Sequence, residues 1–183
     1  MPVSDALSAE DVVTLLGLEP NATCGCVRAT YHSARCIAPG GLAEPFGDGR
    51  PLGSALYFMV TPPAPVRLHR IQNDQLYHYY LGNSLEVFLL HPNGAAERAV
   101  VGPNLRNGER VQLLIPGGVF HTARLIGQEG WFLGASTAWP GVTPADAEIG
   151  DVEELSTRFP VFAADLRAIA GSAQASRPPK GHN

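Results

Sequence analysis

Residues 69–82 of the chain read HRIQNDQLYHYYLG, and residues 116–121 read PGGVFH. In the first stretch His69 is followed six positions later by an amide residue, Gln75, and then by an aromatic run that ends at a glycine. The second stretch is a turn of the form Pro-x-Gly-x-x-His, and it follows an apolar run. Each stretch therefore places a histidine at the end of a predicted strand, and the arrangement of these strands decides the fold.

Short apolar runs separated by turn residues extend from these two stretches in both directions. The chain has 20 glycines and 16 prolines, and the pair Asn93-Gly94 is typical of a tight hairpin. This pattern predicts nine strands, over residues 27–32, 55–60, 66–71, 76–81, 85–91, 97–101, 110–115, 121–126 and 131–136. Nine short strands with evenly spaced turns indicate an all-β domain, either a sandwich or a barrel. The periodicity does not choose between the two.

Predicted helices flank the strands. Ser8 is a suitable N-cap for a short helix that ends at Gly17, and Asp151 is a suitable cap for a second helix. Apolar residues at helical spacing predict one more helix, ending at Gly171. We therefore expect a single domain over residues 1–171. Residues 172–183 are expected to be a disordered tail, because they offer almost nothing to bury.

The composition excludes several classes of protein. Hydrophobic residues make up 45% of the 183 residues and charged residues 16%, which is not the composition of a disordered protein. The net charge is −4 and there is no basic cluster, so nucleic acid is not an expected partner. Apolar runs such as residues 85–90 are too short to span a membrane, and the N-terminus lacks the pattern of a signal peptide. We expect a cytoplasmic protein without a membrane partner.

The two opening stretches resemble the paired sequence motifs of the cupin superfamily, whose members hold a ligand or a metal in the mouth of a β-barrel. Further segments are similar, in order, to a family of small single-domain cupins sometimes called cupin family five: residues 16–20, 28–31, 55–58, 69–70, 74–78, 116–118, 123–125, 140–141, 154–155 and 158–160. The resemblance implies a cupin double-stranded β-helix, a jelly-roll barrel with a short N-terminal helix and C-terminal helices. Members of this family commonly have glutamate at the positions of Ala29 and Gln75, and usually lack a histidine at the position of His121.

A metal site is one function that the resemblance implies. In metal-binding cupins the first motif supplies His-x-His and a glutamate, and the second supplies another histidine. The matching residues in this chain are His69, Ile71, Gln75 and His121. Isoleucine cannot bind a metal, and an amide is a weak neutral ligand, so a divalent ion would have no charged ligand. We therefore expect no cofactor, with a divalent transition metal at His69, Gln75 and His121 as the alternative.

The same residues suit acid–base chemistry without a metal. An imidazole exchanges protons near neutral pH, so His69 and His121, expected on facing strands at the barrel mouth, are the predicted acid–base pair. Tyr79 is the third predicted catalytic residue, as a phenol that donates a proton or a hydrogen bond to an oxyanion. The predicted substrate-binding residues are polar, aromatic or positively charged: Arg28, Tyr57, Gln75, Tyr77, His78, Phe120, Arg124 and Trp131.

These residues also have purely structural interpretations. A histidine on an apolar strand is often a hydrogen-bonded part of the core, aromatic side chains fill barrels, and Arg28 and Arg124 can pair with carboxylates in the barrel wall. The sequence favours a metal-independent enzyme, an isomerase, epimerase, lyase or cyclase that acts on a carbonyl-bearing metabolite. The alternatives are a non-catalytic small-molecule-binding cupin and a metal-dependent cupin such as a dioxygenase. The resemblance further implies a homodimer, whereas the substrate and the pathway are not predicted.

Overall fold

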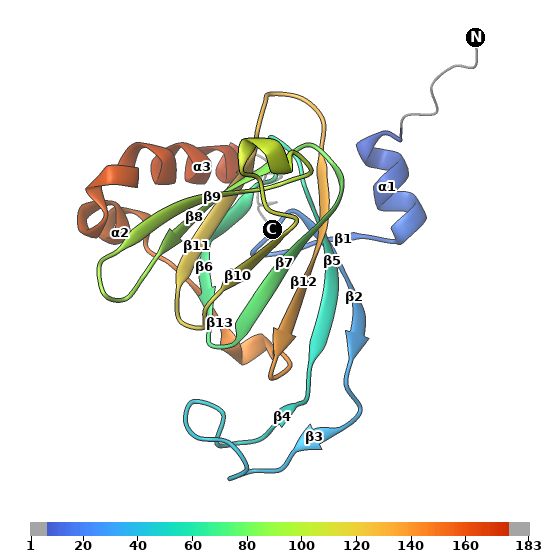
Figure 1. The fold of residues 1–183 in the computed structure, drawn as a ribbon, viewed down its shortest axis with the longest axis vertical. Helices are drawn as coiled ribbons and strands as arrows, with labels where there is room; N and C mark the ends of the chain where they lie inside the picture. The colour runs from blue at the N-terminus through green and yellow to red at the C-terminus, as the bar shows by residue number, and fades with distance from the viewer. Residues whose placement is uncertain (1–6, 176–183) are drawn as a thin grey trace, which may run out of the picture.

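The computed structural model describes residues 7–175. Two antiparallel β-sheets face each other and form a barrel, with helices on the outside (Figure 1). One sheet has six strands, in the order β1 (Glu19–Pro20), β2 (Cys26–His32), β5 (Ser54–Val60), β12 (Phe132–Trp139), β7 (Asp74–Gly82) and β10 (Gln112–Ile115). The other has five, in the order β13 (Ala147–Ile149), β6 (Val66–Ile71), β11 (Phe120–Leu125), β8 (Leu85–Leu90) and β9 (Ala96–Val101). The predicted all-β jelly-roll barrel is confirmed.

Each of the nine predicted strands is present, with ends that differ from the prediction by at most three residues. The Asn93-Gly94 hairpin joins β8 to β9, and Gly94 has the positive φ of 88° that the turn requires. Four further short strands were not predicted: β1, β13, β3 (Cys36–Ile37) and β4 (Arg50–Pro51). They are two or three residues long, which is too short to show an alternating pattern in the sequence.

The main hydrophobic core lies between the two sheets. Successive residues of a strand point to opposite faces, so alternate residues of each strand point into the barrel. Fully buried aromatic and aliphatic side chains from both sheets meet there, among them Phe58, Phe132, Leu85, Val87 and Ile115. This alternation determines which side chains can reach the interior of the barrel.

The N-terminal helix, α1 (Ala9–Leu16), packs on the outer face of the six-stranded sheet, where Val12 contacts Met59 and Leu133. Ser8 and Asp11 form a reciprocal capping box at its start. The helix ends at Gly17, whose φ of 59° is in the left-handed region. The predicted opening helix is therefore confirmed with its caps.

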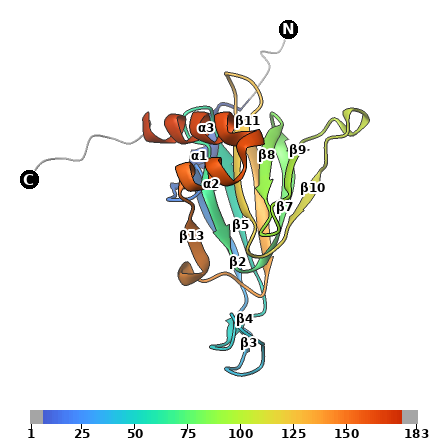
Figure 2. The same cartoon turned by 90° about the vertical axis from the view of Figure 1, so that its left-hand side faces the viewer.

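The C-terminal helices, α2 (Val152–Arg158) and α3 (Ala163–Ala175), cover the outer face of the five-stranded sheet (Figure 2). The prediction that the last helix ends at Gly171 is wrong. The helix continues to Ala175, so residues 172–175 are helical rather than part of a disordered tail. Alanine favours helix, and Ser172 Oγ donates to the carbonyl oxygen of Ala168 at 3.2 Å. Residues 176–183, the rest of the predicted tail, lie outside the described residues.

Three short 3₁₀ helices complete the described secondary structure: η1 (Leu105–Asn107), η2 (Pro144–Asp146) and η3 (Pro160–Phe162). Among residues 7–175, no helix combines the length and the apolar character needed to cross a bilayer.

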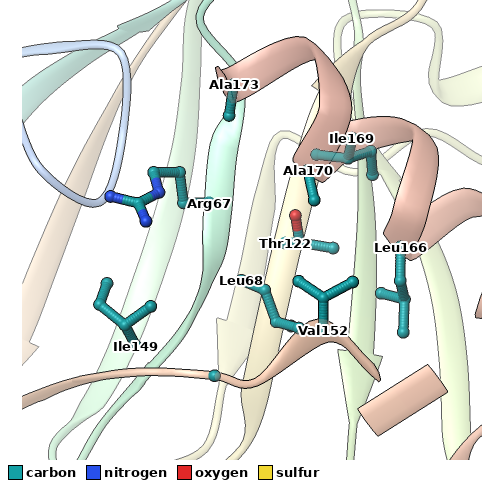
Figure 3. Close-up of a pocket in the computed structure, with 10 residues that line it drawn as sticks. Arg67, Leu68, Thr122, Ile149, Val152, Leu166, Ile169, Ala170 and Ala173 are labelled. Atoms are coloured by element: carbon teal, nitrogen blue, oxygen red, sulfur yellow. The ribbon is translucent and has the colours of Figure 1, made fainter. Parts of the chain in front are cut away.

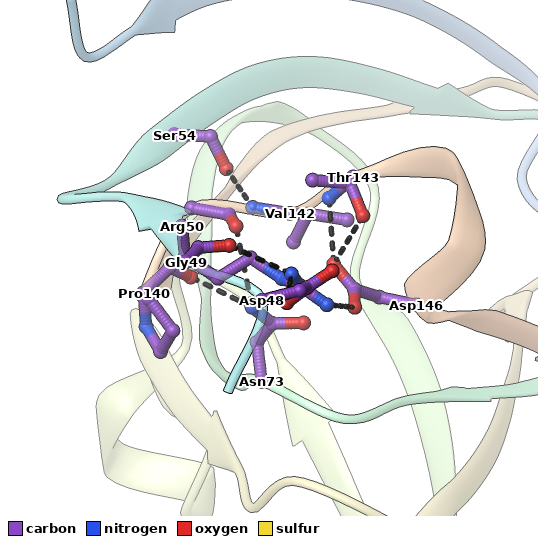
Figure 4. Close-up of polar contacts among 10 residues, drawn as sticks. Asp48, Gly49, Arg50, Ser54, Asn73, Pro140, Val142, Thr143 and Asp146 are labelled. Atoms are coloured by element: carbon purple, nitrogen blue, oxygen red, sulfur yellow. Dashed lines mark hydrogen bonds and ion pairs between the residues drawn. The ribbon is translucent and has the colours of Figure 1, made fainter. Parts of the chain in front are cut away.

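Residues 33–53, which we call the finger, contain β3 and β4 and extend beyond one end of the barrel (Figures 1 and 2). The buried Arg50 anchors the finger: its Nη2 donates to Asp146 Oδ1 at 3.0 Å, and its Nη1 pairs with Asp48 (Figure 4). Asp146 also accepts hydrogen bonds from the backbone N–H and the hydroxyl of Thr143. The finger is thus tied to the segment that connects β12 to β13.

Candidate functional site

A cavity of about 300 Å³ lies at the end of the barrel from which the finger extends. Both sheets line it, with β2, β5, β7 and β12 on one side and β6 on the other. Residues 142–144, between β12 and β13, complete its rim. A cavity is therefore present at the mouth of the barrel, where the sequence predicts a ligand.

The cavity exists because inward positions of the six-stranded sheet carry small side chains at this end. Ser136 lies opposite Leu56 on one neighbouring strand and opposite Tyr77 on the other, so these residues form one inward-facing row. In the row nearer the finger, Ala138 lies opposite Gln75. The small side chains of Ser136 and Ala138 leave space between the sheets. At the start of β12, by contrast, the large side chain of Phe132 fills the core.

His69 and His121 lie side by side on neighbouring strands of the five-stranded sheet, not on facing strands as predicted. Their ring centroids are 4.2 Å apart. His69 lines the cavity, whereas His121 has no exposed surface and does not line it. Of the two histidines, His69 is therefore the one that can contact a ligand.

Hydrogen bonding fixes the position of the proton on His69. Its Nδ1 lies 2.7 Å from the carbonyl oxygen of Arg67, which can only accept, so Nδ1 is the donor. In the neutral ring Nε2 then carries the lone pair, and Nε2 has no hydrogen-bond partner among the described residues. Burial lowers the pKa of His69 below the usual 6.5, which keeps the ring neutral at neutral pH. The cavity wall thus contains an imidazole nitrogen that is free to accept a proton.

Tyr77 links His121 to the cavity. The Tyr77 hydroxyl oxygen lies 3.0 Å from His121 Nε2, and His121 Nδ1 lies 3.4 Å from the carbonyl oxygen of Val119. Because a carbonyl oxygen can only accept, the ring proton belongs on Nδ1, and the Tyr77 hydroxyl donates to Nε2. Burial lowers the pKa of His121 well below 6.5 and raises the pKa of Tyr77 well above 10.0. Both groups are therefore neutral at physiological pH.

Gln75 places an amide in the wall of the cavity. Its side chain is 4% exposed, and its Oε1 accepts a hydrogen bond of 3.0 Å from Ser136 Oγ. Its Nε2 is buried and has no hydrogen-bond partner among the described residues. The site therefore combines a free imidazole nitrogen, a phenol and a free amide donor.

The two arginines that were predicted to bind substrate lie outside the cavity. Arg28 Nη1 donates to the carbonyl oxygen of Leu16 at 2.8 Å, where it satisfies the C-terminal end of α1. Arg124 forms ion pairs with Glu86 and Asp165, and its guanidinium lies over the ring of Phe88. These contacts support a structural role for both arginines, as partners of groups in the barrel wall and its helices.

Four other predicted substrate-binding residues point away from the cavity: Tyr57, His78, Phe120 and Trp131. Tyr57 and Trp131 pack in the cluster beneath α1. Phe120 packs with the C-terminal helices. His78 Nε2 lies 2.8 Å from Thr137 Oγ1 on the outer face, because His78 follows the inward-facing Tyr77 and strand residues alternate.

Tyr79, which was predicted to be catalytic, is not among the residues that line the cavity. Its ring packs against Phe132, and its hydroxyl donates to the carbonyl oxygen of Gly82 at 2.8 Å. Tyr77, two positions earlier on the same face of β7, lines the cavity, as does Tyr31 from β2.

Ser136 and the rim of the cavity were not predicted from the sequence. Counting in twos along the strand from Phe132 places Ser136 on the inner face, so this signal was available. The rim has no such signal, because it depends on contacts between distant segments (Figure 4). The backbone N–H of Val142 donates to Ser54 Oγ at 3.0 Å, and Thr143 is held by Asp146.

A second cavity, of about 130 Å³, lies between α3 and the five-stranded sheet (Figure 3). Aliphatic side chains such as Leu166 and Ile169 line most of it. Its polar groups are already engaged, since the Thr122 hydroxyl donates to the Val66 carbonyl at 2.7 Å and Arg67 Nη1 donates to a backbone carbonyl. We interpret it as a packing gap rather than a binding site.

The residues of the first cavity do not fit a divalent metal ion. His121 directs Nε2 to the Tyr77 hydroxyl and Nδ1 to a carbonyl oxygen, so it offers no nitrogen to the cavity. Of the three predicted ligands, His69 Nε2 and the Gln75 amide remain, and the described lining of the cavity contains no carboxylate. Within residues 7–175, no group of three or more His, Cys, Asp or Glu side chains is arranged to hold a metal.

Known proteins share the fold of this chain. A hypothetical protein from Leishmania major has a similar structure, with a TM-score of 0.79 and 25% identity, over 89% of this chain and 98% of that one. Protein SO0799 from Shewanella oneidensis is similar with a TM-score of 0.76 and 28% identity, over 94% of this chain and 99% of that one. The uncharacterized protein YML079W from Saccharomyces cerevisiae is 28% identical over 74 residues, which cover 40% of this chain and 37% of the yeast protein.

The family assignment rests on a longer match. Residues 10–150 match the family described as Cupin superfamily (DUF985), and this range includes β1 to β13 and every residue discussed for the cavity. The barrel, the cavity at its mouth and the sequence match agree, and the chain belongs to the Cupin superfamily (DUF985) family.

Proposed function

We propose that the protein is a small-molecule enzyme that transfers a proton next to a carbonyl group, without a metal. One observation carries this proposal: His69 Nε2 is a free, neutral imidazole nitrogen in the cavity wall, while its Nδ1–H is held by the Arg67 carbonyl. This is the arrangement of a general base whose proton position is fixed by the protein. Isomerisation, epimerisation, elimination and cyclisation all begin with such a step.

The proposed step is removal of a proton from the carbon next to the carbonyl. His69 Nε2 takes the proton, the electrons of the C–H bond form a C=C bond, and the carbonyl π electrons move to the oxygen. The imidazolium then returns the proton, to the same carbon with inverted configuration or to another atom. Burial lowers the pKa of His69, so the base is in its neutral form when substrate arrives.

Tyr77 is the second group at the cavity that can move a proton. Tyr77 lines the cavity, and its hydroxyl donates to His121 Nε2. His121 does not contact the cavity, so in this proposal it is a positioning residue that orients Tyr77. Tyr79 has no part, since its hydroxyl is bonded to the backbone of Gly82.

The experiment follows deuterium incorporation from D₂O into carbonyl compounds that raise the melting temperature of the protein. The variant His69→Asn retains a side-chain N–H that can reach the Arg67 carbonyl but lacks the free ring nitrogen. We expect it to exchange on the order of 10²-fold more slowly, the usual effect of losing a positioned base. His91→Asn, at the end of the β8–β9 hairpin away from the cavity, is the matched control.

Retention of wild-type exchange in His69→Asn would show that His69 is not the base. Binding of a ligand that is recovered unchanged and undeuterated would instead favour the alternative of a non-catalytic binding protein.

The expected homodimer and cytoplasmic location are also proposals. Exposed apolar residues on the outer face of the six-stranded sheet, including Tyr80 and Leu114, are consistent with a second copy of the chain as partner.

A further inference from the structure

Gln75 lines the cavity, and Ser136 sets the orientation of its side-chain amide. A hydroxyl can donate to the amide oxygen, and the bond of 3.0 Å between Ser136 Oγ and Gln75 Oε1 uses that oxygen. The amide nitrogen then lies on the other side of the group, with two N–H donors and no acceptor capacity. This nitrogen is buried and without a partner among residues 7–175, although buried donors in folded proteins are nearly always paired. A ligand that supplies an acceptor would complete the site.

The cavity contains no formal charge. Among the described residues that line it there is no Lys, Arg, Asp or Glu. Asp146, which accepts hydrogen bonds from the rim residue Thr143, pairs with Arg50, and the guanidinium of Arg50 is already occupied by Asp48 and Asp146 (Figure 4). His69 is neutral, as shown above, so an anion would enter without a positive partner. Burial of an unpaired charge is strongly unfavourable.

We propose that the ligand of this cavity is an uncharged carbonyl compound whose oxygen accepts a hydrogen bond from Gln75 Nε2. This inference rests on the proposed function and specifies its substrate class. Most of the rest of the ligand is apolar, because side chains such as Leu56, Phe58, Ile71 and Val142 line the cavity. Polar side chains line it too: Asn21, Thr23, Tyr31, His32, Ser54 and Thr143.

The two polar groups have complementary tasks toward such a ligand. Gln75 lies near the start of β7 and His69 lies near the end of β6, so the short turn between these strands brings both to the same end of the barrel. When His69 Nε2 removes the proton next to the carbonyl, negative charge develops on the carbonyl oxygen. An N–H donor placed at that oxygen stabilises the charge without a metal.

A matched pair of probes tests the charge preference. Benzylacetone and hydrocinnamate have the same skeleton, but the methyl ketone is neutral and the carboxylate is an anion. We expect benzylacetone to bind at least about tenfold more tightly in calorimetry. In ¹H–¹⁵N spectra of the unmodified protein, its binding should shift the side-chain amide signals of Gln75.

One substitution at Gln75 and one at Ser136 test the donor. Gln75→Met keeps the length of the side chain and removes the N–H groups, so benzylacetone should bind roughly five- to tenfold more weakly. Ser136→Ala leaves the amide in place but releases its orientation, and should have a smaller effect in the same direction. Gln112→Met, on β10 at the exposed outer face, is the matched control and should leave binding unchanged.

The outcomes separate this inference from the proposed function. If benzylacetone binds through Gln75 but gains no deuterium in D₂O, the proton-transfer function fails and the ligand class stands. If deuterium is incorporated but hydrocinnamate binds as tightly, or Gln75→Met binds like the unmodified protein, the inference about Gln75 is overturned while the proton transfer stands. Absence of any Gln75 shift up to the solubility limit of benzylacetone also overturns it.

Discussion

Removal of the Tyr77 hydroxyl tests the buried pair that supports the cavity. Tyr77 is 2% exposed, and its hydroxyl donates to His121 Nε2 at 3.0 Å. Tyr77→Phe keeps the ring and its packing against Phe58, whose centroid is 4.7 Å away, so little apolar contact is lost. It leaves a buried acceptor nitrogen without a donor, which costs about 1–3 kcal/mol.

The expected loss of stability in Tyr77→Phe is large enough to measure by thermal and urea unfolding. For a chain of this length, a loss of about 1–3 kcal/mol lowers the melting temperature by roughly 2–12 °C. Urea unfolding at neutral pH measures the free energy directly, and an unchanged m value shows that the unfolded state is comparable. Tyr79→Phe is the control on the same strand. Its hydroxyl donates to a backbone carbonyl at the strand end, and we expect a loss below about 1 kcal/mol.

A double-mutant cycle decides whether the two side chains act as a pair. His121→Leu removes the acceptor, and the combined variant removes donor and acceptor together. Replacing both partners by apolar groups should cost clearly less than the sum of the single changes. Additivity within about 0.5 kcal/mol, or a Tyr77→Phe variant as stable as Tyr79→Phe, would refute the hydrogen-bonded pair.

Three further predictions follow from the described contacts. Burial lowers the pKa of both His69 and His121 below 6.5, so below that pH the unfolded chain binds protons that the folded chain does not. The contribution of the two neutral histidines to the free energy of unfolding is therefore fully present above pH 6.5. Below that pH it falls by up to about 1.4 kcal/mol per pH unit for each histidine. The melting temperature of His121→Leu should fall less steeply with decreasing pH than that of the unmodified protein. Asp146→Asn breaks the buried pair with Arg50 and should lower the melting temperature several times more than Glu148→Gln, which breaks an exposed pair. Light scattering should give a particle of twice the 19.4 kDa chain mass, and a single-chain mass would exclude the homodimer.

The fold was predictable because its signals are local. Alternation of apolar residues, turn residues such as Asn93-Gly94, and the helix cap at Ser8 each act within a few positions of the chain. The short strands β3, β4 and β13 were not predicted, because their existence depends on contacts such as Arg50 with Asp146, which are separated by 96 positions.

The candidate site was predictable only in part, for a related reason. The sequence indicated His69, Gln75 and Tyr77, which alternate correctly and line the cavity. It did not indicate that His121 lies behind His69 on the adjacent strand, since strand order depends on the whole chain. Arg28 and Arg124 were predicted to bind an anionic group of the substrate because of their residue type alone. Their structural partners on α1 and α3 were not apparent from the sequence.

The small side chains of β12 can be exchanged without disturbing the sheet. β12 is hydrogen-bonded on both sides, to β5 and to β7, and these backbone bonds do not depend on which side chains it carries. Exchanges among small and medium residues at Ser136 and Ala138 therefore change the shape of the cavity while the frame around it persists. Single substitutions at these two positions should therefore change the lining of the cavity and leave the architecture of the barrel unchanged.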